Sequence, residues 1–153
     1  MSNLIKNGEF ILGDTHWKIM NDRQVCVVDG ECRITPPGSI SQEIDNIEAG
    51  AEYALAARMK SASGLIAHVI LKPQPTGEEL CLSLADADNW QVVTDWAIMP
   101  PGTTGASVTL VTEGKTTVAW SHFGSLELVR LDQIKPTHWV ARLIAWIRST
   151  LRS

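Results

Sequence analysis

The chain has 153 residues, of which 44% are hydrophobic and 20% charged, so it is long enough to bury the core of one domain without disulfides or metals. Its net charge of -4 is unevenly divided, because the tail from Lys135 onward has only basic charged residues and residues 1–134 therefore carry about -8. An acidic body argues against nucleic-acid binding, which needs a positive surface, and no apolar run is long enough to span a membrane.

The first ten residues, MSNLIKNGEF, do not read as a secretory signal. Such a signal needs a basic end, an apolar centre and small residues at the cleavage site. We therefore expect a cytoplasmic protein, or export by a leaderless route or inside a larger particle. The sequence leaves these alternatives open.

The N-terminal third predicts short strands. Residues 3–12 predict two strands around an Asn7-Gly8 turn, residues 16–20 another strand, and residues 24–35 a hairpin around Asp29-Gly30. A two-residue turn puts Val27 opposite Cys32 and Cys26 opposite Arg33, so that the two sulfurs point to opposite faces. We expect all three cysteines, Cys81 included, to be reduced and buried.

The central stretch, residues 38–60, predicts two strands joined by a turn at residues 48–50. Its second half alternates Tyr53, Leu55, Ala57 and Met59 with other residues, and this period of two predicts one buried and one solvated face. A turn at residues 61–64 should then lead into a strand over residues 65–72 that is apolar on both faces.

The remaining pattern predicts strands over 80–85, 90–99, 106–113 and 116–129, with a loop at 86–89. The last two of these strands are expected to form a hairpin around Gly114-Lys115. About ten short strands with evenly spaced turns and no helix between them predict an all-β antiparallel sandwich or barrel.

The C-terminal tail predicts a basic amphipathic helix over residues 136–152, beginning after Pro136 with Thr137 as its cap. Its apolar arc and its basic residues would form the partner-binding or membrane-binding surface. The apolar residues are Trp139, Val140, Leu143, Ile144, Trp146, Ile147 and Leu151, and the basic ones are Arg142, Arg148 and Arg152. Such a face must be covered by its own domain or a second copy, by another protein, or by an anionic membrane.

Several short motifs follow one another in a fixed order along residues 3–130. They are 3–10 (NLIKNGEF), Trp17, 38–44 (GSISQEI), 49–55 (AGAEYAL), Trp90, 101–104 (PGTT) and 118–129. Together they resemble the jelly-roll carbohydrate-binding modules of families four and nine, within the galactose-binding-like fold group. The resemblance implies a two-sheet jelly roll over residues 1–131 that binds glycans without catalysis, usually beside another domain.

Modules of this type often hold a structural calcium ion between an N-terminal acidic residue, which Glu9 matches, and an acidic pair in the last strand. Here Ser121 and His122 stand where those carboxylates are expected. Calcium prefers six to eight oxygen ligands, many of them charged. The sequence therefore offers Glu9 as a calcium ligand but lacks its acidic partners.

Sugar recognition requires an exposed aromatic ring and nearby polar groups. Trp17 and Trp90 stand at positions that resemble core tryptophans of the family. The faces of the strand 90–99 are ambiguous, because both carry apolar residues, and Trp96 is core if Asp95 lines a wet face. The candidate ligand-binding residues are Trp96, Trp120, Arg58, Gln91, Asp95 and His122, with His68 as a further polar candidate.

Two functions are consistent with these patterns. The first is a non-catalytic glycan-binding module, and the second is a structural or adaptor module of a secreted toxin or phage-like particle that docks through the C-terminal helix. No nucleophile elbow, zinc helix motif or dinucleotide-binding glycine pattern is present, so we expect no enzyme activity.

Overall fold

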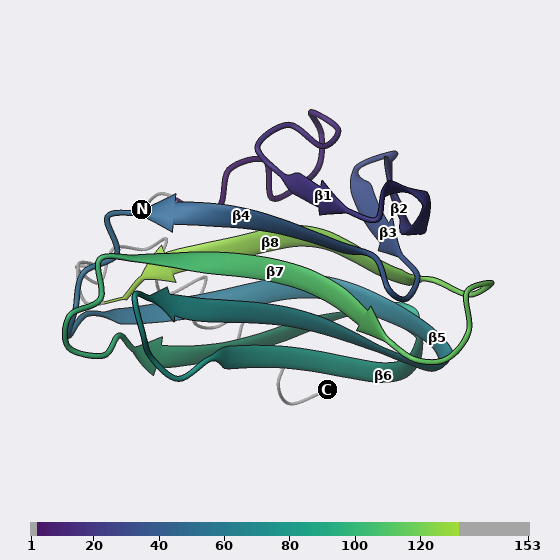
Figure 1. The fold of residues 1–153 in the computed structure, drawn as a ribbon. Coiled ribbons are helices and arrows are strands. Elements are labelled where there is room, and N and C mark those ends of the chain that lie inside the picture. Colours follow the sequence, from purple (N-terminus) through teal and green to yellow (C-terminus); the bar gives the residue numbers. More distant parts are fainter. Residues whose placement is uncertain (1–2, 132–153) are drawn as a thin grey trace, which may run out of the picture.

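The computed structural model describes residues 3–131, which fold into antiparallel β-structure (Figure 1). A short 3₁₀ helix, η1 (Asp22–Gln24), precedes the first hairpin. The strands are β1 (Lys18–Met20), β2 (Val25–Val28), β3 (Glu31–Ile34), β4 (Ser39–Asp45), β5 (Glu52–Gln74), β6 (Leu80–Ile98), β7 (Gly105–Glu113) and β8 (Ser121–Arg130). This confirms the all-β antiparallel prediction.

Two layers are formed because β5 and β6 run through both of them (Figure 1). Residues 52–61 of β5 pair with β8, and residues 66–74 pair with β7. We call the first layer the β8 sheet, in the order β6-β5-β8-β3-β2, and the second the β7 sheet, in the order β6-β5-β7-β4-β1. The result is a β-sandwich whose two sheets share one long hairpin.

The crossing point of β5 lies where the sequence predicted a turn. The pairing with β6 shifts register on both sides of Ser61, and Gly64 has a positive φ of 82°. The Ser61 hydroxyl donates to the Leu65 carbonyl at 3.0 Å and also contacts the Ser121 hydroxyl at 3.1 Å. The predicted turn at 61–64 is therefore wrong, because these residues form a bulge that bends one continuous strand from one sheet to the other.

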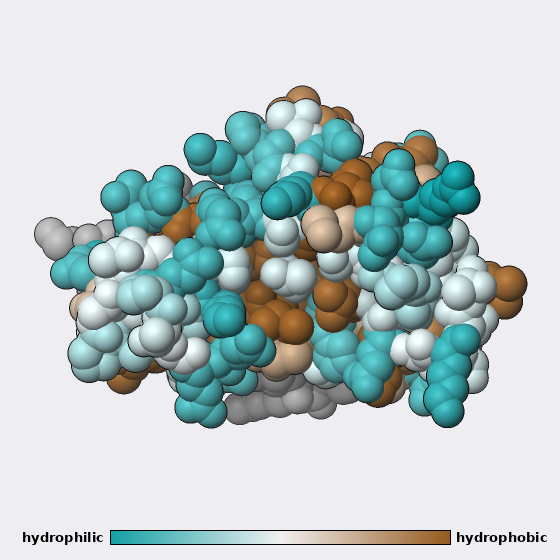
Figure 2. Space-filling model, viewed as in Figure 1, coloured by the Kyte–Doolittle hydropathy of each residue, from teal (hydrophilic) through white to brown (hydrophobic). Residues whose placement is uncertain are grey.

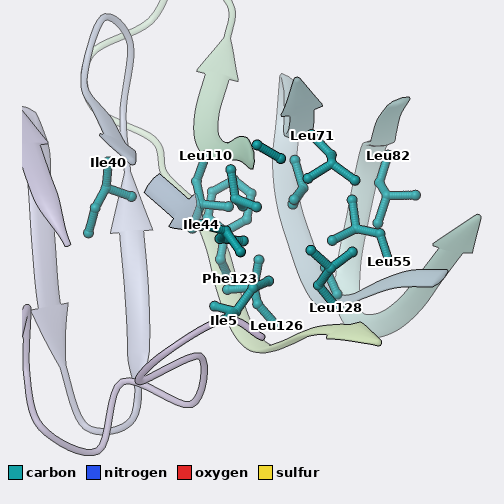
Figure 3. Packing of buried hydrophobic residues seen from close by; sticks show 14 of the residues in the cluster. Ile5, Ile40, Ile44, Leu55, Leu71, Leu82, Leu110, Phe123, Leu126 and Leu128 are labelled. Carbon is teal, nitrogen blue, oxygen red and sulfur yellow. The ribbon is translucent and has the colours of Figure 1, made fainter. Parts of the chain in front are cut away.

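The core lies between the two sheets and confirms the predicted buried face of residues 53–59, whereas the predicted solvated face is wrong at Ala54 and Ala56, which are 2% and 4% exposed. Tyr53, Leu55, Ala57 and Met59 are at most 1% exposed. In the second half of β5 the residues at 65, 67, 69 and 71 are fully buried, while their neighbours are partly exposed. Figure 3 shows inward residues of both sheets converging, with Phe123, Leu126 and Leu128 from β8 facing Leu110 from β7.

The Asp29-Gly30 hairpin has the predicted register, with Val27 opposite Cys32 and Cys26 opposite Arg33. The three thiols are unpaired. Cys32 is buried as predicted, and burial, followed by the charges of Cys26 and Glu31, raises its pKa to about 12. The prediction of burial is wrong for Cys26 and Cys81, which are exposed because each points to the outer side of its strand.

The N-terminal segment is a loop, so the two strands predicted over residues 3–12 are wrong. Asn7 donates to the carbonyls of Gly13 and Thr15, and its side-chain oxygen accepts from the Leu12 amide. Side-chain amides that bond the backbone in this way replace a strand ladder with a compact turn. The loop lies along β8, where Leu4 N–H donates to the Leu128 carbonyl at 2.9 Å.

Two other predicted boundaries are also wrong. Residues 86–89, expected as a loop, lie within β6, and the final strand begins at Ser121 rather than at residue 116. The expected final hairpin is also wrong, because β7 pairs with β4 and β5, while β8 pairs with β3 and β5. Within residues 3–131, no helix is long and apolar enough to cross a membrane. The predicted helix over 136–152 lies outside the described residues, together with its candidate partner-binding residues Trp139, Leu143, Trp146, Ile147, Arg142 and Arg148.

Candidate functional site

The outer face of the β8 sheet combines small residues at its centre with large ones around them. Because Tyr53, Leu55 and Met59 point into the core, the alternate residues of β5 point outward. Across the strands, these outward residues meet β6 on one side and β8 on the other. The paired rows are Trp96-Ala54-Val129, Thr94-Ala56-Glu127, Val92-Arg58-Gly124 and Lys60-His122. Alanine and glycine therefore line the middle of this face as its floor, in which Ala54 and Ala56 are only 2% and 4% exposed.

Trp90 lies on this outer face, so the prediction that it is a core residue is wrong. The Arg58 guanidinium carbon is 4.6 Å from the centre of its ring, and the Lys60 ammonium is 5.1 Å away. The His122 ring meets it edge-on at 6.1 Å. A Cβ atom built on Gly124 would lie 3.7 Å from the indole, which shows how closely the ring covers this glycine. Arg58 and His122, predicted separately, are thus brought together by a tryptophan that sequence reasoning assigned to the interior.

The burial of alternate residues along β6 shows on which side of this strand the Trp90 side chain lies. Val93 and Ala97 pack against the core and Met99 is 2% exposed, which leaves Trp90 and Trp96 pointing outward. Trp96 is 52% exposed, in keeping with its proposed role as a ligand contact. Trp17, by contrast, is buried against Phe10 with 5.4 Å between ring centres, as predicted.

A charged cluster adjoins Trp90 at the β3 edge. The Glu31 carboxylate accepts a hydrogen bond from Arg33 Nε and lies 2.8 Å from His122 Nδ1. Burial alone would raise the pKa of Glu31, but its hydrogen bonds to Arg33 and His122 outweigh this and lower it. Within residues 3–131, Glu31 thus has two partners, while neither Arg58 nor Lys60 forms an ion pair with an acidic side chain.

A pocket of about 500 Å³ lies at the opposite end of the same face, between β8 and the N-terminal loop. Its lining consists of Asn3, Ile5, Asn7, Gly8, Glu9, Ile11, Leu12, Glu127 and Val129. Ile11 and Leu12 are 74% and 64% exposed and form an apolar rim. Burial, followed by the charge of Glu9, raises the pKa of Glu127. The pocket thus extends the face toward Glu127, a carboxylate whose pKa is raised.

The raised pKa of Glu127 gives a testable stability effect. An acid whose pKa is raised by folding destabilises the native state above that pKa, and this destabilisation disappears below the unfolded value, near 4.5. Replacing Glu127 with Gln should therefore raise the melting temperature at pH 7, and the gain should vanish by about pH 4. Thermal melts of both proteins across this range measure the effect. A gain that is the same at pH 4 and pH 7 would show that its origin is not the carboxylate charge.

His68 lies on the other side of the sandwich, on the outer face of the β7 sheet. Its Nδ1 is 2.7 Å from the Ser83 hydroxyl and its Nε2 is 2.8 Å from the Glu113 carboxylate, and the Cys81 sulfur is 3.7 Å from Nδ1. Figure 2 views the molecule from the side on which β7 and β4 lie in front, and shows apolar residues gathered in the middle between hydrophilic ones. Because His68 lies on the outer face opposite that of Trp90, it cannot take part in a site built around Trp90.

The remaining predicted ligand contacts lie at the edges of the molecule. Asp95 and Gln91 are exposed on β6, and the Asp95 carboxylate accepts from the Trp96 amide at 2.8 Å. Trp120 is half-buried in the segment before β8, where its carbonyl accepts from the Ala62 amide. Among residues 3–131, the cation and ring contacts of Trp90 come from Arg58, Lys60 and His122, and not from these three side chains.

The residues at the expected calcium site have other partners. Ser121 is fully buried against Ser61, and His122 is bonded to Glu31, while Glu9 lines the pocket with Glu127. In the described part of the chain, no three histidine, cysteine or acidic side chains come together in a way that could hold a metal. Calcium binding at Glu9 stays a prediction.

No protein-family model matches the chain, and no curated protein matches it in sequence. Among solved structures, the chain is similar to a family 61 carbohydrate-binding module in complex with β-1,4-galactotriose, with a TM-score of 0.68, 13% identity, and coverage of 86% of this chain and 100% of that one. It is also similar to a family 4 module, with a TM-score of 0.62, 15% identity, and coverage of 83% and 99%.

The same fold is found in the enzymatically active domain of tailspike protein 4 of bacteriophage CBA120, with a TM-score of 0.66 and 13% identity. The match covers 84% of this chain and only 21% of the tailspike chain. At such low identities the likeness defines a fold. The chain has the jelly-roll β-sandwich fold of carbohydrate-binding modules, as the sequence motifs predicted.

Proposed function

We propose that this protein is a non-catalytic glycan-binding module that holds a sugar chain against the outer face of the β8 sheet. The observation that carries the proposal is the pair of outward tryptophans, Trp90 and Trp96, on one face of the sandwich. Aromatic rings pack against the C–H faces of sugars, and Trp96 is 52% exposed. Structures of the same fold are carbohydrate-binding modules, one of them in complex with a galactotriose, which supports this ligand class.

The polar groups of the face are suited to sugar hydroxyls. Arg58 and Lys60 present N–H donors beside Trp90, while Glu127 presents carboxylate oxygens at the pocket. The face thus has polar side chains at both ends and small residues in the middle. A chain of several sugar units fits such an arrangement better than one compact ligand does.

The test is a titration of neutral and acidic oligosaccharides against the wild-type protein and the Trp90→Ala variant. We expect millimolar or tighter binding to at least one glycan, and a loss of about tenfold or more in Trp90→Ala, because a stacked ring contributes on the order of 1 kcal/mol or more. Met20→Ala is the control, since it removes an exposed apolar side chain from β1, on the β7 sheet. An absence of binding at millimolar ligand, or an equal loss in both variants, would refute the proposal.

The adaptor hypothesis has no support in residues 3–131. Its docking helix lies outside the described residues. The outer face of the β8 sheet instead presents two tryptophans and polar side chains that could contact a ligand. The geometry therefore favours the glycan-binding proposal.

A further inference from the structure

We infer that the glycan carries an anionic group, a uronic acid carboxylate or a sulfate ester, which is bound by Arg58 and Lys60 at the Trp90 end of the face. The inference rests on the proposed glycan-binding function and specifies the chemical class of the ligand. It starts from the charge of this region, which is opposite to that of the protein as a whole.

The Trp90 end has an excess of positive charge in an acidic chain. Arg33 is paired with Glu31 and also experiences the charge of Asp29, so the excess rests on Arg58 and Lys60, neither of which forms an ion pair with an acidic side chain among residues 3–131. The whole chain has a net charge of -4. An excess of this kind on one face attracts anionic ligands and raises their rate of association.

The two unpaired cations are also held in place. Arg58 and Lys60 are two positions apart on β5, so their side chains lie on the same side of the strand. Both contact the Trp90 ring. A guanidinium that lies over an aromatic ring keeps its in-plane N–H groups available, and these match a carboxylate or sulfate in a bidentate arrangement. The ring thus orders the cations without satisfying their hydrogen bonds.

Three carboxylates of this face, those of Glu31, Glu9 and Glu127, do not compete for Arg58 and Lys60. Glu31 is occupied by Arg33 and His122. Glu9 and Glu127 line the pocket at the far end of the face, where they would repel a second anion. The arrangement therefore favours a ligand with an acidic group at one end and neutral sugar along the floor, over a uniformly charged polymer.

The experiment compares oligosaccharides with their uncharged counterparts by calorimetric titration of the full chain. The probes are a xylo-oligosaccharide with one glucuronic acid, an oligogalacturonide, their methyl esters, and a monosulfated galactan oligosaccharide with its desulfated form. We expect the charged member of at least one pair to bind about tenfold tighter or more, with an advantage that falls as salt is raised. The uronate and sulfate arms identify which anion is recognised.

The matched variants are Arg58→Gln with Lys60→Gln, and Lys18→Gln with Lys72→Gln as a control. The control removes the same charge from exposed positions on the β7 sheet. We expect only the first pair to abolish the advantage of the charged ligand, while its affinity for the uncharged form changes less than threefold.

The outcomes separate the two proposals. Equal affinity for charged and uncharged ligands, with binding still dependent on Trp90, would refute the anionic class and leave glycan binding intact. Equal effects of the two variant pairs would also refute it, because the charge would then act non-specifically. No binding to any probe at millimolar concentration would refute both.

Discussion

Replacing Phe123 with Ala should lower the free energy of unfolding by about 3 to 5 kcal/mol, the largest effect expected for a core residue here. Phe123 is fully buried on β8, directly opposite Met59 of β5 and Cys32 of β3. Figure 3 shows its ring within the cluster where the two sheets meet. Truncation removes the ring from apolar contact and leaves a cavity that rigid strands on both sides cannot close.

Urea denaturation followed by circular dichroism measures this loss. Val118→Ala is the matched control, because Val118 is 87% exposed and its truncation should change stability by less than about 0.5 kcal/mol. Phe123→Leu, which keeps most of the volume, covers the case in which the alanine variant does not fold, and should cost less than about 1.5 kcal/mol. A loss of under about 1 kcal/mol in Phe123→Ala would contradict a ring enclosed between two sheets.

The inward residues of β5 show what could be predicted from the sequence. Alternation along a strand identifies its inward side whenever one side is clearly more apolar, as in Tyr53, Leu55 and Met59. The Asp29-Gly30 turn likewise determined its own register, because a two-residue hairpin fixes which residues face each other. These features depend only on neighbours along the chain.

The bend of β5 could not be predicted in the same way. A serine and glycine cluster between two apolar runs is equally typical of a tight turn and of a bulge. The choice depends on whether the following run pairs back onto the preceding one or onto a different strand. Here residues 66–74 pair with β7 instead, a contact that no local pattern contains.

The candidate site was predicted only in part for a related reason. Both faces of β6 carry apolar residues, so alternation grouped Trp90 with Trp96 but did not show which group was buried. The ring's neighbours come from two other strands, β5 and β8, and the bond between Glu31 and His122 joins residues 91 positions apart. Sequence motifs therefore suggested Arg58 and His122 individually, while only the strand order shows that they share one tryptophan.

Replacing Gly8 with Val should destabilise the protein by about 3 kcal/mol or more, because any side chain at this position collides with the main chain of β8. A Cβ atom on Gly8 would clash with the Leu126 carbonyl oxygen, a backbone atom that cannot move aside as a flexible side chain can. The Gly8 carbonyl also accepts from the Leu126 amide at 2.9 Å. Displacement of this segment would pull Ile5 and Phe10, both buried, away from the core.

The control for Gly8→Val is Gly50→Ala. Gly50 has a positive φ of 78° and no atom within 4 Å of a built Cβ, so its substitution tests backbone strain without a clash and should cost about 1 to 2 kcal/mol. Gly8→Ala should already exceed that loss in urea denaturation, although Gly8 has no left-handed conformation to strain. Since Gly8 also lines the pocket beside Glu9, the variant should weaken glycan binding at the Glu127 end. A Gly8→Ala protein as stable as wild type would contradict the close contact between this loop and β8, and with it the wall that bounds the pocket.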